Sequence, residues 1–403
     1  MLQEVKSHFT ALKQTVGSVP VVFLDGPAGT QVPDRVIEDM VQYYHQSNAN
    51  THGQFANAQE TDEMMHQTRK DVASFLNASS PDCISFGQNM TTLSFSLARA
   101  FSRIFKPGDE VLITQLDHEA NRGPWLTLRD VGVKVREIKL LPSGILDYDD
   151  FHAKLNDRTR LVCVGGASNF TGTVNDLQQV RQATYQSGAW MLVDAVHYAP
   201  HFLIDVAALG CDFLLCSAYK FYGPHVGILY AKDGLLSQLP TDRLRTQDPV
   251  APYRIETGTL NHAAIAGVQG AIRWMASWGD GHPLREQLAY AFQRIRAHER
   301  QLARKLYNGL LHLPGITVIG PDLDVEMRAP TLSFFHHDLP AETVSHRLGE
   351  KGIFAWDGHF YAIRAAETLG LLERGGVTRM GISMYTEESD IDRTLDVLAD
   401  ICR

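Results

Sequence analysis

Between residues 80 and 232, short apolar runs alternate with longer amphipathic stretches. The apolar runs have the length and the β-branched and aromatic content of strands, and the stretches between them have helical spacing. Such alternation predicts an α/β fold with a mainly parallel sheet and helices on both faces. The expected strands are 83–86, 110–114, 133–138, 160–167, 190–195, 213–218 and 227–231, and the expected helices are 91–105, 176–188 and 205–210.

The pattern changes after about residue 262, where two long helical stretches lead into shorter strand-like pieces and a closing helix. This order predicts a smaller α+β domain, with strands at 316–320, 331–337, 353–356 and 378–385. The first residues predict an amphipathic helix, because apolar side chains recur at helical spacing at Leu2, Val5, Phe9, Leu12 and Val16. We expect a large domain over 20–262 and a small domain from 1–19 and 263–403.

Charge and hydropathy narrow the functions that the chain can have. The 403 residues carry a formal net charge of −9, which argues against a basic face for nucleic acid. No run approaches the ~18 apolar residues of a membrane span, and the first residues do not resemble a signal peptide. We therefore expect a cytoplasmic protein without a membrane partner. The five cysteines form no CxxC pair, so neither a disulfide framework nor a metal site is expected.

Lys220 follows an apolar run, in the turn SAYKFYGP. A lysine usually lies on a solvated surface, but Tyr219, Phe221 and Tyr222 flank this one, and desolvation lowers the pKa of an ammonium group. A neutral amine is what a lysine needs to form a Schiff base. Lys220 is therefore a candidate carrier of a carbonyl cofactor, provided that neighbouring strand ends supply the other groups that such a cofactor needs.

Asp194 ends the apolar run 189–193, where an acidic side chain faces the crevice at the edge of a parallel sheet. A carboxylate there could keep the pyridine nitrogen of pyridoxal 5′-phosphate (PLP) protonated, although a helix cap would have the same sequence. His197, three residues later, could reach the 3′-oxygen of the ring. A loop histidine with a purely structural role remains the alternative.

Three further strand ends carry suitable polar groups. SFGQNM predicts a helix N-terminus that can hold a phosphate, with added contacts from Gln88 and Asn89. His118 could stack on a pyridine ring, and Asn169 could hydrogen-bond its 3′-oxygen. Because the carboxyl ends of parallel strands share one edge, these groups together predict a single PLP site.

The order of these motifs resembles the class V aminotransferase family of fold-type I PLP enzymes, and within it the cysteine desulfurase-like group. The resemblance spans about residues 20–395, and the lysine segment with the upstream VDA is its most specific part. The matching segments are LDGPAGTQVP (24–33), FGQNMTT (86–92), DHEANRGPW (117–125), SNFTGTVND (168–176), VDAVHYAPH (193–201), CDFLLCSAYKFYGPHVGILY (211–230), RIETGTLN (254–261), WDGHFYA (356–362) and TRMGISMYTEE (378–388).

The resemblance implies a role for each matching residue. Lys220 would form the Schiff base and later carry the substrate's α-proton, Asp194 would pair with the pyridine nitrogen, and His118 would stack on the ring. Asn169 and His197 would lie near the 3′-oxygen. The residues implied to hold the phosphate are Gln88, Asn89, Ser217 and Tyr219, the last in place of a histidine common in the family.

The resemblance also implies groups for substrate and for assembly. Arg379 would bind the substrate's α-carboxylate, a task that suits a planar guanidinium. Thr259 would reach the phosphate of a partner subunit, which implies a homodimer with its active site at the interface. Taken alone, Arg379 would be an ordinary surface arginine.

The segment WDGHFYAIR departs from the cysteine desulfurase pattern. Tyr361 stands where those enzymes carry the cysteine that accepts sulfur as a persulfide, and Trp356 replaces a basic residue. A phenol cannot hold a persulfide, so we expect a lyase or transferase that acts on an amino acid without this thiol. Trp356, His359, Tyr361 and His52 are the expected substrate-binding residues, with core packing as the alternative for the aromatic ones.

Three alternatives to this interpretation remain open to comparison with the sequence. The first is a true cysteine desulfurase or selenocysteine lyase, since selenocysteine cleavage can proceed without the acceptor thiol. The second is a PLP-binding protein without turnover, against which the retention of both Lys220 and Arg379 argues. An NAD-dependent enzyme is disfavoured, because no GxGxxG follows the first strand.

Overall fold

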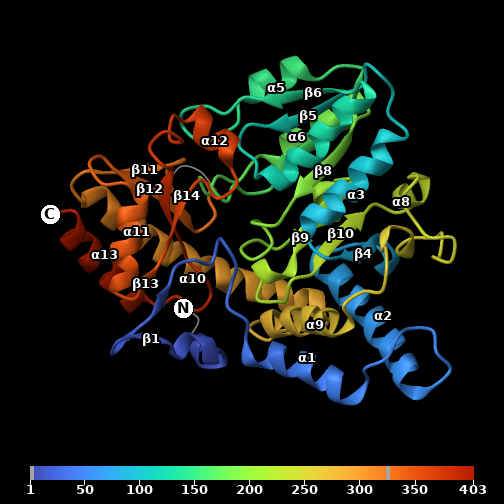
Figure 1. The fold of residues 1–403 in the computed structure, drawn as a ribbon, viewed down its shortest axis with the longest axis horizontal. Coiled ribbons are helices and arrows are strands. Elements are labelled where there is room, and N and C mark those ends of the chain that lie inside the picture. The colour runs from blue at the N-terminus through green and yellow to red at the C-terminus, as the bar shows by residue number, and fades with distance from the viewer. Residues whose placement is uncertain (1–3, 324–326) are drawn as a thin grey trace.

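The structure is a computed structural model that describes residues 4–323 and 327–403. Two regions lie side by side, one around a seven-stranded sheet and one around a four-stranded sheet (Figure 1). The large sheet has the strand order β4-β10-β9-β8-β7-β5-β6. Its strands are β4 (Ile84–Gly87), β5 (Glu110–Thr114), β6 (Lys134–Ile138), β7 (Thr159–Gly165), β8 (Trp190–Asp194), β9 (Phe213–Ser217) and β10 (Gly227–Ala231).

The large sheet is mainly parallel, as the sequence predicts. Neighbours from β6 through β9 pair in parallel, and β10 alone runs antiparallel to its neighbours β4 and β9. Both faces are apolar because successive side chains of a strand point to opposite faces. In β7, Leu161 and Cys163 join one buried cluster, whereas Val162 and Val164 join the other. The expected α/β class is confirmed.

Helices cover both faces of the large sheet. Helix α3 (Met90–Ser102) packs in the first cluster through Leu93, Leu97 and Phe101, together with Trp125 of the short helix α4 (Gly123–Leu126). Four helices contribute apolar side chains to the cluster on the opposite face of the sheet. These are α2 (Ala56–Leu76), α6 (Leu177–Ser187), α9 (His262–Ala276) and α10 (Leu284–His312).

The small sheet is antiparallel and has the order β11-β12-β15-β14. Its apolar side packs against α10 and two C-terminal helices, with Leu302, Leu306, Phe334 and Met380 fully buried. Helix α10 runs from this region beneath the large sheet and so links the two (Figure 1). The elements are β11 (Ile316–Ile319), β12 (Thr331–His336), α11 (Ala341–Glu350), β14 (Trp356–Gly358), α12 (Ile363–Thr368), β15 (Val377–Gly381) and α13 (Glu388–Ile401).

The amphipathic helix expected at the N-terminus does not form. Two 3₁₀ turns, Val5–His8 and Thr10–Lys13, precede a hairpin of β1 (Thr15–Val16) and β2 (Val19–Pro20), and Leu2 lies outside the described residues. The amide and hydroxyl of Thr10 both donate to the Asp34 carboxylate, which interrupts helical hydrogen bonding. Phe9 is still buried, against Tyr222, Trp274 and Tyr385.

The segment after the hairpin contacts both the small region and the large region. Strand β3 (Val22–Phe23) pairs in parallel with β13 (Ile353–Phe354) beside the small sheet. The expected strand 353–356 is thus split into β13 and β14. Helix α1 (Asp34–Gln46), which the sequence analysis did not identify, then packs along α9. The expected domain boundaries stay a prediction.

Several short elements complete the chain. Among them are α5 (Tyr148–Lys154), α7 (Val206–Leu209), α8 (Leu235–Gln238) and the 3₁₀ turn Ala218–Lys220. The expected helix 205–210 is a single turn, because Gly210 in the left-handed region (φ 65°) ends it. Every helix within 4–323 and 327–403 is too short or too polar to cross a bilayer.

A buried ion pair ties α2 to the edge of the large sheet. The guanidinium of Arg69 donates to both carboxylate oxygens of Glu256 at 2.7 Å. Arg69 also donates to the carbonyl of Ile84, and Glu256 accepts from the backbone N–H of Phe86 at 2.6 Å. Removing one partner leaves a buried charge without compensation, which costs more than the pair itself contributes.

Replacing Glu256 by Ala should therefore lower the free energy of unfolding by about 3 kcal/mol. The shift of the urea-unfolding midpoint, followed by circular dichroism, measures this loss. Glu63→Ala is the matched control: it removes one exposed carboxylate on α2, the helix that carries Arg69, and should change the free energy by less than about 0.5 kcal/mol. Equal effects of the two substitutions would contradict a structural role for the pair.

Candidate active site

The carboxyl edge of the large sheet borders a cavity of about 670 Å³. Asp194 and Ser217 are the last residues of β8 and β9, and His118 and Asn169 follow β5 and β7. The structure thus brings together groups that the sequence placed at separate strand ends. The expected site residues that line this cavity are Asn89, His118, Asn169, Asp194, His197, Ser217, Tyr219 and Lys220.

A second cavity, of about 920 Å³, opens from the same place towards the small sheet. It shares His118, Asn169 and Lys220 with the first cavity, so the two form one continuous site. The expected substrate-binding residues that line it are Trp356, His359, Tyr361 and Arg379. Lys220 therefore lies where the first cavity, at the strand ends of the large sheet, meets the second cavity, beside the small sheet.

Lys220 is buried, and its amine is held by backbone carbonyls. The Nζ atom donates to the carbonyl of Pro27 at 2.5 Å and to that of Ala28 at 3.0 Å. Burial, and after it the positive charge of Arg379, lower the pKa of Lys220 to about 7, although the charge of Asp194 opposes the shift. A large fraction of this amine is thus neutral near pH 7, as nucleophilic attack requires.

Two buried carboxyl groups lie side by side at the strand ends. Burial raises the pKa of Asp194 to about 6, although its Oδ1 accepts from the N–H of Val196. Burial and the neighbouring Asp194 raise the pKa of Asp117 to about 7, and Asp117 accepts from Asn121 and from the N–H of Gly165. Neither carboxyl forms an ion pair with a described residue, so a cationic ring nitrogen fits here.

Two imidazole rings face the cavity uncharged. Burial, followed by Lys220 and Arg379, lowers the pKa of His118 to about 4, and its Nδ1 accepts from the N–H of Ala120. Burial also lowers the pKa of His197 far below its usual range. The Nε2 of His197 contacts the Thr331 hydroxyl at 2.9 Å, whereas its Nδ1 is buried without a partner. Such an orphaned nitrogen suits a ligand oxygen.

The far end of the first cavity has the features of a phosphate site. Asn89 caps α3 by accepting from the N–H of Thr92, and the hydroxyl of Ser217 accepts from the N–H of Met90. Tyr219 stacks on His225 with the ring centroids 4.6 Å apart. Gln88, by contrast, is exposed and lines neither cavity.

The sequence analysis missed Thr91 and His225 at this end of the cavity. Thr91 is the second residue of α3 and lines both cavities, whereas His225 lines only the first. The helix start predicted near residue 90 could have pointed to Thr91, because the first N–H groups of a helix lack partners within the helix. No sequence signal marked the stacking of His225 on Tyr219.

Arg379 reaches the second cavity from β15 of the small sheet. Its Nη1 donates to the carbonyl of Asn169 at 3.0 Å, its guanidinium lies 3.9 Å from the ring centre of Phe360, and its Nε is buried without a partner. Burial lowers its pKa to about 9. The charge of Asp25, a residue that the sequence analysis did not identify, raises the pKa of Arg379 and so opposes this shift. Spare donors on a buried guanidinium suit a substrate carboxylate.

The loop 359–362 joins the two regions above the cavity. Asn169 donates to the carbonyl of Phe360 at 2.9 Å, and the N–H of Glu119 donates to that of Tyr361 at 2.8 Å. The Tyr361 ring lies 5.5 Å from that of His118. Tyr361 and Trp356 are 69% and 53% exposed, so these aromatic side chains line the mouth of the site and are not part of the core.

His52 and Thr259 do not lie at this site within one chain. Both line a separate cavity of about 890 Å³, together with Arg69 and Glu256. His52 is largely exposed, and its Nδ1 lies 3.7 Å from the carboxylate of Asp62. Their expected roles stay predictions, and that of Thr259 requires a partner subunit.

Comparison of the sequence with known proteins identifies the family to which the chain belongs. The profile of the aminotransferase class-V family matches residues 22–394. The chain belongs to this family. It is 31% identical to a cysteine desulfurase of Yersinia pseudotuberculosis over 97% of the chain and 96% of that protein. It is 30% identical to a cysteine desulfurase of Salmonella choleraesuis over 100% of the chain and 98% of that protein.

Solved structures agree with this membership. A cysteine desulfurase from Thermococcus onnurineus superposes with a TM-score of 0.86 at 26% identity, covering 95% of this chain and 94% of that one. The cysteine desulfurase CsdA of Escherichia coli gives a TM-score of 0.85 at 27% identity, covering 99% and 98%. The expected family, the fold-type I architecture and the dependence of the enzyme on PLP are thereby confirmed.

The low pKa of Lys220 has a measurable consequence for the apo-enzyme. Because the neutral fraction of an amine with a pKa of about 7 rises about tenfold from pH 6 to pH 8, the rate of covalent PLP attachment should rise equally and then level off. Stopped-flow absorbance measures this rate. A rate that still rises tenfold per pH unit up to pH 9 would show an ordinary lysine and contradict the assignment.

Proposed function

We propose that this chain is a PLP-dependent enzyme that acts on an amino acid through Lys220, as a lyase or transferase without a persulfide cysteine. One observation carries the proposal: the amine of Lys220, with a pKa of about 7, lies in a continuous cavity between Asp194 and Arg379. When bound there, PLP supplies an electron sink for the bonds at the substrate's α-carbon.

The residues around Lys220 divide the remaining tasks. Arg379 binds the α-carboxylate of the amino acid with its spare N–H donors and so fixes the α-carbon near Lys220. Lys220 Nζ would take and return the α-proton. Asp194 would hold a proton on the ring nitrogen, and the neutral ring of His118 would stack on the pyridine.

The cysteines support a reaction without an acceptor thiol. All five lie among the described residues, and none lines either cavity around Lys220. Burial raises the pKa of the Cys163 and Cys216 thiols, which keeps them protonated and weakly nucleophilic. Cys402 lies at the end of α13, on the far side of the small region (Figure 1).

The mouth of the cavity indicates the kind of substrate. Trp356, His359 and Tyr361 line it. The resemblance implies that Tyr361 stands where cysteine desulfurases carry the acceptor cysteine. Aromatic rings at a mouth favour a substrate with an apolar or bulky side chain, because such a side chain is desolvated against them. His359 is placed to act on that side chain and not on the α-carboxylate, which Arg379 holds.

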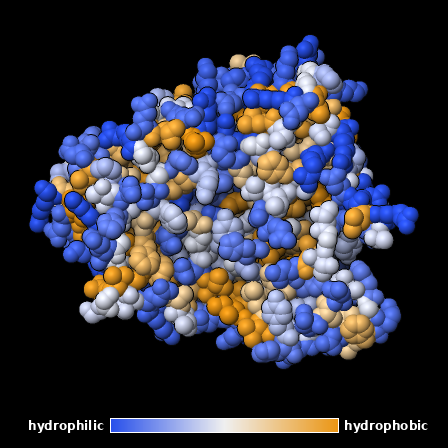
Figure 2. Space-filling view, in the orientation of Figure 1, coloured by the Kyte–Doolittle hydropathy of each residue, from blue (hydrophilic) through white to orange (hydrophobic). Residues whose placement is uncertain are grey.

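A homodimer is part of the proposal. Ile37, Val41 and Tyr44 follow one another at helical spacing on α1 and are 48%, 45% and 57% exposed. Figure 2 shows apolar side chains exposed where α1 lies. A second copy of the chain that covers this face would also bring Thr259 of one subunit towards the other's site, as the resemblance implies.

Substituting Lys220 by Ala should abolish the visible absorbance band of the purified enzyme and its activity towards amino acids, because no other lysine among the described residues lines the cavity. Absorbance spectra after gel filtration with added PLP test this. Lys232→Ala, an exposed lysine at the end of β10, is the control and should keep the band. A band retained in Lys220→Ala refutes the assignment.

After turnover with L-cysteine, no cysteine of the wild-type enzyme should carry a persulfide, since none reaches the cavity. Mass spectrometry of alkylated peptides detects such a modification. Tyr361→Cys introduces a thiol beside His118 and should acquire one. A persulfide on any native cysteine would restore the cysteine desulfurase alternative.

A further inference from the structure

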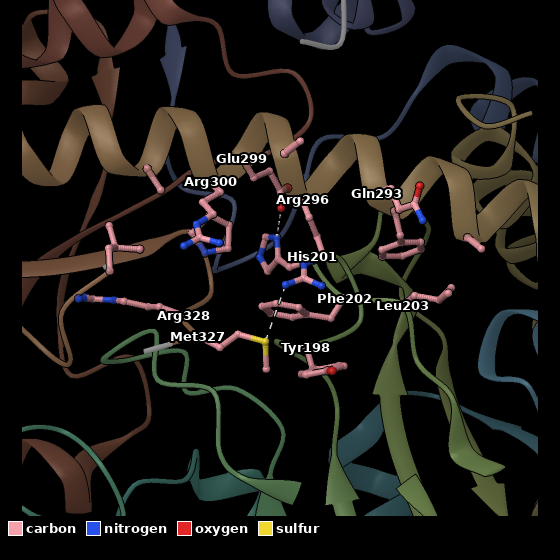
Figure 3. A pocket seen from close by; sticks show the side chains of 16 residues that line it. Tyr198, His201, Phe202, Leu203, Gln293, Arg296, Glu299, Arg300, Met327 and Arg328 are labelled. Atoms are coloured by element: carbon pink, nitrogen blue, oxygen red, sulfur yellow. Dashed lines mark hydrogen bonds and ion pairs between the residues drawn. The ribbon is translucent and has the colours of Figure 1, made fainter. Parts of the chain in front are cut away.

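A cavity of about 700 Å³ lies behind the cofactor site and shares no lining residue with the cavities around Lys220. Helix α10 forms one wall, the turn 198–203 after β8 forms the floor, and the segment 327–330 closes one side (Figure 3). Nothing in the proposed reaction uses these residues. Its lining combines three guanidinium groups with an aromatic surface.

Two of the arginines stand one helical turn apart on α10. Arg296 contacts the sulfur of Met327 at 3.8 Å and lies over the ring of Phe202, and Arg300 is exposed beside His201 (Figure 3). Neither forms an ion pair with a carboxylate among the described residues. Two like charges at this spacing repel each other unless an anion lies between them.

The third arginine is buried. Arg328 donates to the carbonyls of Pro321 and Ile319, and its Nε is buried without a partner. Burial lowers its pKa to about 10, so it still carries its charge at neutral pH. Asp322, whose charge acts on Arg328, does not line the cavity.

The only carboxylate among the lining residues that the structure describes is already paired. Glu299 is buried, and its Oε2 lies 2.9 Å from Nδ1 of His201. The remaining charges on the lining residues that the structure describes are therefore positive. The field in a cleft with charges of one sign attracts ions of the opposite sign.

The floor of the cavity is aromatic. Tyr198 and Phe202 stack with ring centroids 4.7 Å apart and planes 29° apart, and the guanidinium of Arg296 lies 5.3 Å from the ring centre of Phe202. Because Arg296 already covers a face of Phe202, an apolar group packs beside it, against Tyr198, Leu203 and the edge of Phe202. The site thus suits a ligand with two parts, an oxyanion and an apolar body.

We propose that this cavity is a second ligand site, which binds a small molecule that carries a carboxylate or phosphate on an apolar or aromatic body. Arg296 and Arg300 bind the oxyanion, and Tyr198 and Phe202 support the body. His201 separates this ligand from the cofactor cavity, since its ring lies 5.5 Å from that of His197.

Titration calorimetry of the PLP-loaded, full-length enzyme tests the proposal, with phenyl phosphate, inorganic phosphate and phenol as probes. Phenyl phosphate should bind at one site per chain and at least about tenfold more tightly than either fragment. Arg300→Gln and Arg296→Gln should each weaken its binding about tenfold, because a charge-assisted hydrogen bond is lost. The visible band should not change, which shows that the probe leaves the cofactor site alone.

The matched control is Arg294→Gln, on the same helix. Arg294 donates to the carbonyl of Trp278 and does not line the cavity, so its loss removes the same charge without removing a contact with the ligand. The proposal is overturned if Arg294→Gln weakens binding as much as Arg300→Gln does, if phenol binds as tightly as phenyl phosphate, or if no saturable binding occurs up to roughly 10 mM. None of these outcomes bears on the role of Lys220.

Discussion

The Lys220 amine is held out of water by two backbone carbonyls, within the field of Arg379 and Asp194. Burial of an ammonium group costs several kcal/mol unless the group releases its proton, and the lowered pKa is the expression of that cost. The fold supplies the burial, because Lys220 follows the last residue of a strand inside a sheet covered on both faces. The chemistry of the site therefore follows from the position of one residue in the architecture.

Two regions of the chain must stay in contact for this environment to exist. Arg379 comes from the small sheet, yet it donates to the carbonyl of Asn169 at the edge of the large one. The amide of Asn169 in turn holds the loop at Phe360. Any relative movement of the regions would change the charge that Lys220 experiences and the opening at Tyr361 together. The opening at Tyr361 and the charge near Lys220 thus depend on the same contacts.

Sequence reasoning succeeded where a local pattern determines structure. Alternating apolar runs gave the mainly parallel sheet, and polar residues at the strand ends gave the cavity. It failed where contacts between distant segments decide. Asp34 interrupts the N-terminal helix at Thr10, and Asp25 reaches Arg379 from far along the chain. Near the start of α3, Gln88 is exposed, whereas Asn89 and Thr91 line the cavity. Sequence patterns place the end of a helix only to within one or two residues, so they could not separate these positions.

The central claim is that an amino acid held by Arg379 reacts at Lys220 with bound PLP. A visible absorbance titration of the purified enzyme against a panel of amino acids, including cysteine and selenocysteine, with mass spectrometry of the products, tests it most directly. The account predicts a band that shifts saturably with an amino acid of apolar or bulky side chain, and a shift that is lost in Arg379→Gln. No band even after PLP is added, or a band that no amino acid perturbs, would contradict it.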